Sequence, residues 1–175
     1  MHIILVGLPG AGKTTVGRLA ASELAVPFVD VDAHIEKETG MSVAMIFAEL
    51  GEAGFRRMET GAVLRLVEET DRSVLAPGGG WAAQPGNLES VAGRSFCVYL
   101  RTSAQTAAGR ISESLVDGDV RPLVSPGREL SAIAALLMNR EPYYVRSDVS
   151  VTTDGRSATQ VAAEVVELAR IRRAI

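Results

Sequence analysis

The chain has 175 residues, of which 47% are apolar, and its 18 Lys and Arg against 21 Asp and Glu give a net charge of −3. These averages fit one globular domain over residues 1–175 and argue against two classes of protein: a nucleic-acid binder would cluster cations, and a membrane span would need an apolar run of about 18 residues. Because Cys97 is the only cysteine, we expect a buried, reduced thiol and a cytoplasmic protein.

Five short apolar runs predict the strands of one sheet. They are residues 3–6, 28–31, 73–76, 96–100 and 149–151. The longer stretches between them have the three-to-four-residue apolar spacing of helices, and strands that alternate with helices favour a parallel sheet. We therefore expect an α/β domain with a five-stranded parallel sheet and helices on both of its faces.

The helices between these strands have recognisable ends and apolar faces. Ser42 is placed to cap a helix that Gly51 would end, and the next helix should run to about residue 70. Its buried side is marked by Phe55, Ala62 and Leu66. Two later stripes predict core-facing helices, the first ending near Pro142: Leu130, Ile133, Ala134, Leu137 and Met138, and then Val161, Val165 and Leu168.

One long stretch, residues 111–127, has no clear periodicity and contains two prolines and two glycines. A loop of this length inside a compact domain is typically functional, so we expect a mobile lid. Arg121 lies in it, and a lid that closes could bring its guanidinium onto an anionic group and neutralise developing charge there.

Residues 7–14 read GLPGAGKT, the phosphate-loop pattern, between a predicted strand and a predicted helix. Its glycines let successive backbone N–H groups converge on one anion, Lys13 brings a positive charge to the β- and γ-phosphates, and the Thr14 hydroxyl can ligate Mg²⁺. The glycine order differs from that of dinucleotide-binding loops, and the Asn-Lys-x-Asp signature of GTPases is absent. The predicted contacts to ATP in this segment are Gly10, Ala11, Gly12, Lys13, Thr14 and Thr15.

Two carboxylates, Asp30 and Asp32, fall at the carboxyl end of the second predicted strand, where ligands bind in open parallel sheets. On an extended strand, residues two apart share a face. One carboxylate could then support a metal while the other accepts the proton of an attacking hydroxyl. The alternative is that Asp32 only caps the following helix.

Three glycines, Gly78, Gly79 and Gly80, follow the third predicted strand. They could let a ligand lie against bare backbone, or they could form a plain flexible loop. Arg56 and Arg140 could be solvated surface charges. If both face the site, their planar guanidinium groups suit a carboxylate substrate.

Several of these motifs, in this order, resemble those of the shikimate kinases, a family of the nucleoside-monophosphate-kinase-like phosphate-loop group. The resemblance covers nearly the whole chain. It implies the three-layer αβα P-loop kinase fold, with a shikimate-binding region at about 32–60 and a mobile lid at about 111–127. The motifs that carry it are residues 7–14, Asp30-Val31-Asp32, Ile46-Phe47, Gly51-Glu52, Phe55-Arg56, Glu59, residues 78–80, Arg121-Pro122-Leu123 and the run from Arg140 to Tyr144.

The resemblance also implies a reaction, the transfer of the γ-phosphoryl group of MgATP to the 3-hydroxyl of shikimate on the route to chorismate and aromatic amino acids. Lys13, Asp32 and Arg121 would be the catalytic residues. Asp30 would be the metal's outer partner beside Thr14, and Arg110 would flank adenine. The implied shikimate contacts are Asp32, Arg56, Gly78, Gly79, Gly80 and Arg140.

Three features depart from the family pattern. The segment 110–121 is longer and more acidic than expected. The loop 153–158 lacks a proline, which leaves Arg156 as a weak nucleotide contact. Trp81 stands where a small residue is usual, and it either narrows the acceptor pocket or fills core space.

Two alternatives stay open at this point. One is another small-molecule kinase of the same fold, such as a gluconate kinase, and the other is a nucleotide-binding regulatory module that has lost turnover. We expect a monomer whose partner is a small-molecule substrate, with no nucleic acid and no membrane.

Overall fold

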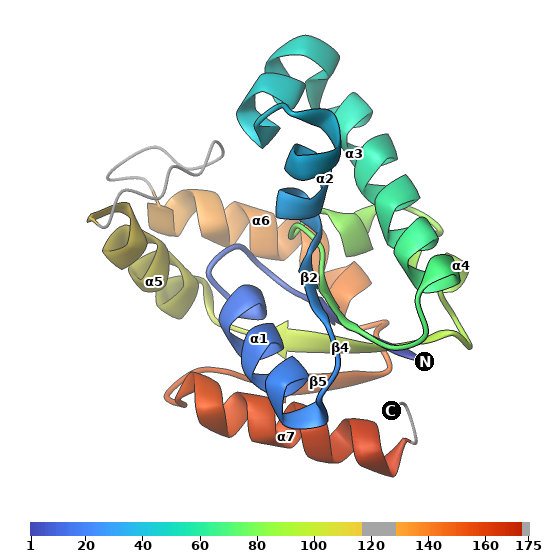
Figure 1. Ribbon diagram of the computed structural model, residues 1–175. Helices are drawn as coiled ribbons and strands as arrows, with labels where there is room; N and C mark the ends of the chain where they lie inside the picture. Colours follow the sequence, from blue (N-terminus) through green and yellow to red (C-terminus); the bar gives the residue numbers. More distant parts are fainter. Residues whose placement is uncertain (117–128, 173–175) are drawn as a thin grey trace.

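The computed structural model describes residues 1–116 and 129–172. Five strands form one parallel sheet in the order β2-β3-β1-β4-β5 (Figure 1). All five predicted strands are confirmed, except that Ser73 precedes β3 and Val31 belongs to the helix that follows β2. The strands are β1 His2–Val6, β2 Phe28–Asp30, β3 Val74–Ala76, β4 Ser95–Arg101 and β5 Val149–Thr152.

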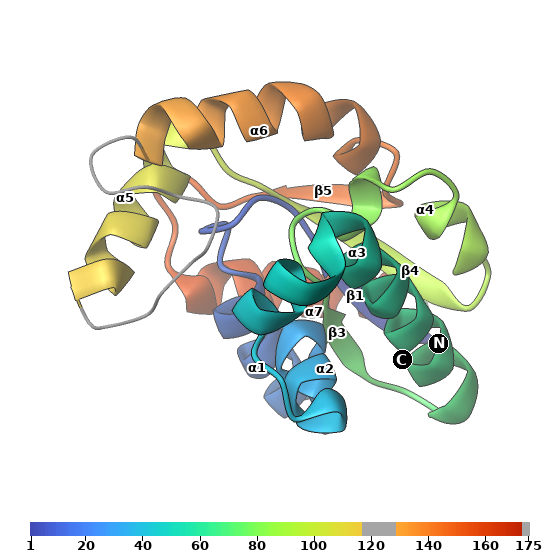
Figure 2. The ribbon, with the colours of Figure 1, turned by 90° about the horizontal axis from the view of Figure 1, so that it is seen from above.

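Helices cover both faces of this sheet. Figure 2 shows α6 on one side and α1 with α7 on the other, which confirms the predicted three-layer arrangement. None of the helices within the described ranges is long and apolar enough to cross a bilayer. The helices are α1 Lys13–Leu24, α2 Val31–Thr39, α3 Val43–Glu69, α4 Asn87–Ser90, α5 Ala104–Val116, α6 Glu129–Tyr144 and α7 Ala158–Ile171, with a short 3₁₀ turn at Trp81–Ala83.

The central strand β1 is wholly buried because β3 and β4 flank it and helices cover both faces. The strand order has a direct consequence for function. Because the strands are parallel, the carboxyl ends of β2, β3 and β1 lie next to one another. The segments after them are Asp30–Asp32, Gly78–Gly80 and the phosphate loop, so the fold brings the three predicted motifs to one edge of the sheet.

The helix starting at Val43 has the predicted cap, since the Ser42 side chain accepts a hydrogen bond from the Met45 N–H at 3.2 Å. The prediction that Gly51 ends this first helical segment is confirmed, although a second segment follows at once and both lie within α3. Gly51 has φ 67° and ψ 176°, which kinks α3 there, and the helix resumes and continues to Glu69. A positive φ favours glycine, so the residue type was informative although the element continues.

Two predictions about the later helices are wrong. Residues 111–116, expected at the start of a lid, form the last turns of α5, while the rest of that lid lies outside the described residues. The helix α6 ends at Tyr144, near Pro142 as predicted, and the Val145 N–H donates to the Glu141 carbonyl at 3.0 Å. Met138 is 80% exposed and therefore does not join the core.

Candidate active site

The phosphate loop between β1 and α1 is folded so tightly that it needs its glycines. Gly10 has φ 79°, and a Cβ there would lie 2.5 Å from the Ala107 carbonyl oxygen. Gly12 caps α1 with no side-chain hydrogen bond, so the N–H groups of the first helical turn have no partner within the helix. The loop therefore presents backbone donors and the positive end of a helix to an anion.

Lys13 lies over this loop, and its Nζ donates to the carbonyls of Gly7 and Leu8, both at 3.0 Å. The Thr14 hydroxyl donates to Asp30 Oδ2 at 2.9 Å, which brings together the two residues predicted to serve the metal. In the part of the chain that the structure describes, no group of three or more His, Cys, Asp or Glu could hold a metal ion.

Asp32 does not share a strand face with Asp30, so that prediction is wrong. Asp30 is the last residue of β2, and its Oδ1 accepts a hydrogen bond from the Ala33 N–H at 3.4 Å. The helix therefore starts at Val31, and Asp32 lies in its first turn. The capping role suggested for Asp32 belongs to Asp30 instead.

Asp32 points toward the triple glycine. A Cβ on Gly78 would lie 3.2 Å from Asp32 Oδ1, and among the described residues that buried oxygen has no hydrogen-bond partner. Burial raises the pKa of Asp32, the nearby Asp30 carboxylate raises it further, and Lys13 and Arg56 oppose the rise. An unsatisfied carboxylate oxygen with a raised pKa is suited to take a proton from a ligand.

Arg56 is 7% exposed and lies beside the same glycines, so it is not a solvated surface charge. Its Nη1 donates to Glu59 Oε2 at 2.7 Å, and its Nη2 lies 3.3 Å from Glu52 Oε1. A Cβ on Gly80 would lie 2.5 Å from Arg56 Cζ. The glycines thus make room for the site's own side chains, which neither interpretation of the triple glycine foresaw.

Glu59 is one of the residues that carry the family resemblance, but the sequence alone suggests no role for it. It is fully buried, and its Oε1 has no hydrogen-bond partner among residues 1–116 and 129–172. Burial raises its pKa to about 7, with Arg56 opposing the rise and the negative charge of Asp32 adding to it. The signal in the sequence was the spacing, since residues three apart on a helix are neighbours.

We expect this carboxyl to make stability depend on pH. A pKa raised from 4.5 to about 7 means that the folded chain holds an extra proton, so this stabilisation is complete below about pH 4.5 and is lost as the pH rises through about 7. The difference in melting temperature between the native chain and Glu59→Gln, which mimics the protonated form, should therefore shift in favour of the variant from pH 5 to pH 8. A constant difference, or one that shifts the other way, would contradict the assignment.

Arg140 is half-buried on α6, and its positive charge opposes the rise that burial causes in the pKa of Tyr144, four residues later. The charges of Arg56 and Glu59 also act on the pKa of that phenol. The Tyr144 hydroxyl donates to the Gly79 carbonyl. These contacts bring α6 to the triple glycine.

The remaining predicted arginines have different positions. Arg110 contacts the phosphate loop, with its Nη1 3.4 Å from the Gly10 carbonyl oxygen and 3.2 Å from Thr153 Oγ1. The Arg156 guanidinium is bound by the Thr152 carbonyl at 3.0 Å and by Glu164 at 2.5 Å, which holds it against α7. Arg121 lies outside the described residues.

Trp81 is 1% exposed, so it fills core space.

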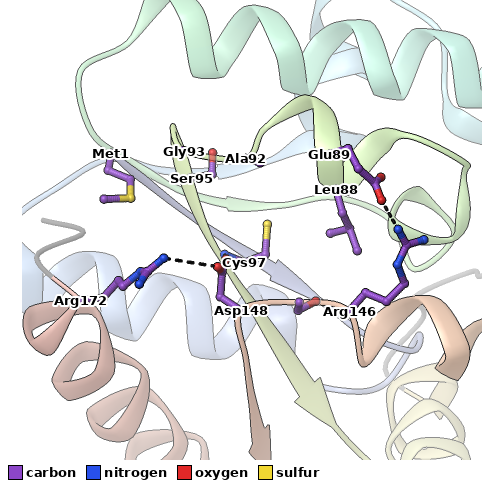
Figure 3. A pocket seen from close by; sticks show the side chains of 11 residues that line it. Met1, Leu88, Glu89, Ala92, Gly93, Ser95, Cys97, Arg146, Asp148 and Arg172 are labelled. Atoms are coloured by element: carbon purple, nitrogen blue, oxygen red, sulfur yellow. Dashed lines mark hydrogen bonds and ion pairs between the residues drawn. The ribbon is translucent and has the colours of Figure 1, made fainter.

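A separate cavity of about 520 Å³ lies at the amino end of β4, around Cys97 (Figure 3). Burial raises the pKa of the Cys97 thiol to about 12, as expected for an unreactive buried residue. None of the predicted site residues lines this cavity.

Comparison with known proteins decides the family. A sequence model described as "Shikimate kinase" matches residues 9–170. The shikimate kinase of Moorella thermoacetica is 42% identical over 166 residues, which are 95% of this chain and 92% of that protein. The chain belongs to the shikimate kinase family. The shikimate kinase of Thermus thermophilus is 39% identical over 165 residues, which are 94% of this chain and 88% of that protein.

Solved structures agree with this family. The shikimate kinase of Acinetobacter baumannii, solved in complex with shikimate, matches with a TM-score of 0.87 and 34% sequence identity. The match covers 98% of this chain and 94% of that structure. A gluconokinase from Sinorhizobium meliloti matches with a TM-score of 0.61 and 18% sequence identity, over 98% of this chain and 96% of the gluconokinase chain. At that identity, the match shows only that the two proteins share a fold. These comparisons confirm the predicted P-loop kinase fold. They also confirm the prediction of an ATP-dependent kinase of the shikimate pathway over the two alternatives, a gluconate kinase and a regulatory module.

Proposed function

We propose that the edge of the sheet formed by the phosphate loop, Asp32 and the triple glycine transfers the γ-phosphoryl group of ATP to the 3-hydroxyl of shikimate. The products are shikimate 3-phosphate and ADP. The observation that supports this best is the convergence of Asp32 and buried Arg56 on residues 78–80, next to the phosphate loop. Family membership supports the same acceptor.

The acceptor is held through its carboxylate and its hydroxyls. Arg56 and Arg140 bind the carboxylate, because two planar guanidinium groups can each donate paired hydrogen bonds. Asp32 accepts from the reacting hydroxyl, and the backbone of Gly78, Gly79 and Gly80 forms the wall beside it. The shikimate-binding region thus extends over residues 32–60, with Arg140 added from α6.

The nucleotide's phosphates lie on the backbone N–H groups of Gly10, Ala11, Gly12, Lys13, Thr14 and Thr15. The Lys13 ammonium and Arg121 neutralise charge on the transferring group, which is the main catalytic contribution that protein side chains make to phosphoryl transfer. Arg110, at the base of the proposed lid, flanks adenine. Arg156 is proposed only as a peripheral contact, because Glu164 already binds it.

Thr14 and Asp30 would hold Mg²⁺, Thr14 through its hydroxyl and Asp30 through the outer shell. Their oxygens are the hard ligands this ion takes, and the 2.9 Å hydrogen bond between them already aligns the pair. When bound, the ion supplies positive charge to the phosphate oxygens. The protein's own step is at Asp32, which takes the proton from the acceptor hydroxyl as its oxygen forms the new bond to phosphorus and the bond to ADP breaks.

A coupled assay of ADP release tests this function. With ATP and Mg²⁺, the purified chain should release ADP with shikimate and not with gluconate or nucleoside monophosphates. Turnover with gluconate alone would assign another kinase activity to the same fold. Absence of turnover with every acceptor, while ATP still binds, would favour the regulatory alternative.

All of the proposed contacts come from one chain, so we propose that it acts as a monomer. We also propose a cytoplasmic location, since ATP is the phosphoryl donor and the sole cysteine is a buried thiol. Residues 117–127, the part of the predicted lid that follows α5, are proposed as the lid that brings Arg121 to the phosphates.

A further inference from the structure

The motif that begins at Arg140 ends on Tyr144, a residue that the proposed chemistry does not use. Its side chain is fully buried, and its ring lies 5.1 Å from the ring of Tyr99 on β4. We propose that Tyr144 is a positioning residue that holds both the Gly79 peptide and Arg140 in place for the acceptor's carboxylate. This inference rests on the function proposed above.

The first contact is with the triple glycine. The Tyr144 hydroxyl donates to the carbonyl of Gly79, the middle residue of the three. Gly78 packs against Asp32 and Gly80 packs against Arg56, so the Gly79 carbonyl lies between the two parts of the acceptor site. Because a peptide bond is planar, holding this carbonyl also fixes the orientation of the Gly80 N–H.

Gly79 itself lies against the phosphate loop. A Cβ there would be 3.0 Å from the Gly7 carbonyl oxygen and 3.0 Å from Pro9 Cδ. The triple glycine therefore closely approaches the phosphate loop, and the hydrogen bond from Tyr144 restrains the Gly79 carbonyl. These two restraints fix the distance between the acceptor wall and the phosphates.

The second contact is with Arg140. The two residues are four apart on α6, so their side chains are neighbours on one helix face, and the charge of Arg140 acts on the pKa of the phenol. A hydroxyl can donate one hydrogen bond and accept others, so donating to Gly79 leaves it able to accept from the guanidinium. One buried hydroxyl thus links the arginine proposed to bind the carboxylate to the glycine wall.

Tyr99 supplies a matched control. Its ring packs on the ring of Tyr144, and burial raises its pKa to about 12, as it does for Tyr144. In the described part of the chain, however, the Tyr99 hydroxyl has no hydrogen-bond partner. Removing that hydroxyl changes the same aromatic pair without touching Gly79 or Arg140.

We expect Tyr144→Phe to raise the KM for shikimate about tenfold, because a buried carbonyl and an arginine each lose a partner. The KM for ATP should stay within about twofold of the native value, and Tyr99→Phe should change neither constant. An unchanged KM for shikimate in Tyr144→Phe, or an equal rise of both KM values, would overturn the proposal. So would the same rise in Tyr99→Phe.

A double variant gives a second, independent readout. If the hydroxyl acts partly through Arg140, Tyr144→Phe should raise the shikimate KM less in an Arg140→Met background than in the native chain. Fully additive effects would overturn the link between the two residues. Failure of the proposed function is distinguishable, since the native chain would then release no ADP with shikimate.

Discussion

Replacing Asp32 by asparagine is expected to lower kcat about a thousandfold while the chain remains folded. The amide has the size of the carboxylate but cannot take the proton of the acceptor hydroxyl. The KM for shikimate should change far less, because Arg56 and Arg140 still bind the carboxylate. Steady-state kinetics with both substrates varied would separate the two constants.

Stability should move in the opposite direction from activity in this variant. The buried Asp32 Oδ1 has no hydrogen-bond partner among the described residues, and burial raises the pKa of this carboxyl. A neutral side chain removes that unfavourable charge, so the melting temperature of Asp32→Asn should equal or exceed the native one. Asp71→Asn, at an exposed acid, is the control and should keep native kcat. Turnover near the native rate in Asp32→Asn would remove the residue from the reaction.

Replacing Arg56 by alanine is expected to raise the KM for shikimate about a hundredfold or more, with ATP binding retained. The reason is that Arg56 is almost fully buried and lies against Gly80, so its loss removes one of the two guanidinium groups proposed to bind the carboxylate. Arg57→Ala is a matched control, because it removes the same residue type one position away on the exposed side of α3. A native KM in Arg56→Ala would place the acceptor elsewhere.

The Arg56→Ala variant also leaves Glu59 buried without its ion-pair partner, so it should unfold at a lower temperature than the native chain. Loss of stability could be mistaken for loss of binding. The double variant with Arg56→Met and Glu59→Gln separates the two, since it removes both charges. Its melting temperature should recover toward the native value while the KM for shikimate stays high.

The scaffold was predictable because local patterns report burial. Residues 3–6 form a continuous apolar run, as expected for a strand covered on both faces, and β1 is entirely buried. The phosphate loop was predictable for a related reason, since its backbone geometry allows few residue types. Ser42 shows the same for a helix start, where one side-chain oxygen satisfies one N–H group.

The errors arose where the sequence pattern fits two structures equally well. The alternation of Asp30 and Asp32 assumed that the strand continues, whereas the Asp30 side chain caps a helix that begins at the next residue. The apolar stripe on α6 includes Leu130 and Met138, which have core-type spacing but are 54% and 80% exposed. Spacing identifies a helical face but does not fix how wide its buried part is.

The contacts that complete the site depend on tertiary structure and left little signal. Tyr144 reaches Gly79 across 65 residues of sequence, and nothing local to either residue specifies that pairing. Glu59 had a helical spacing to Arg56, but its complete burial follows from the packing of α3 against the triple glycine. The order of the motifs along the chain was enough to identify them as candidate site residues, but the distances between them come only from the fold.

The most direct test of this account is a crystal structure of the chain with shikimate, Mg²⁺ and an ATP analogue that cannot transfer its γ-phosphoryl group. We expect the shikimate carboxylate within hydrogen-bond distance, about 3 Å, of both Arg56 and Arg140, with a ring hydroxyl at Asp32 and the triphosphate on the phosphate loop. Shikimate bound away from those two arginines, for example in the cavity beside Cys97, would contradict it.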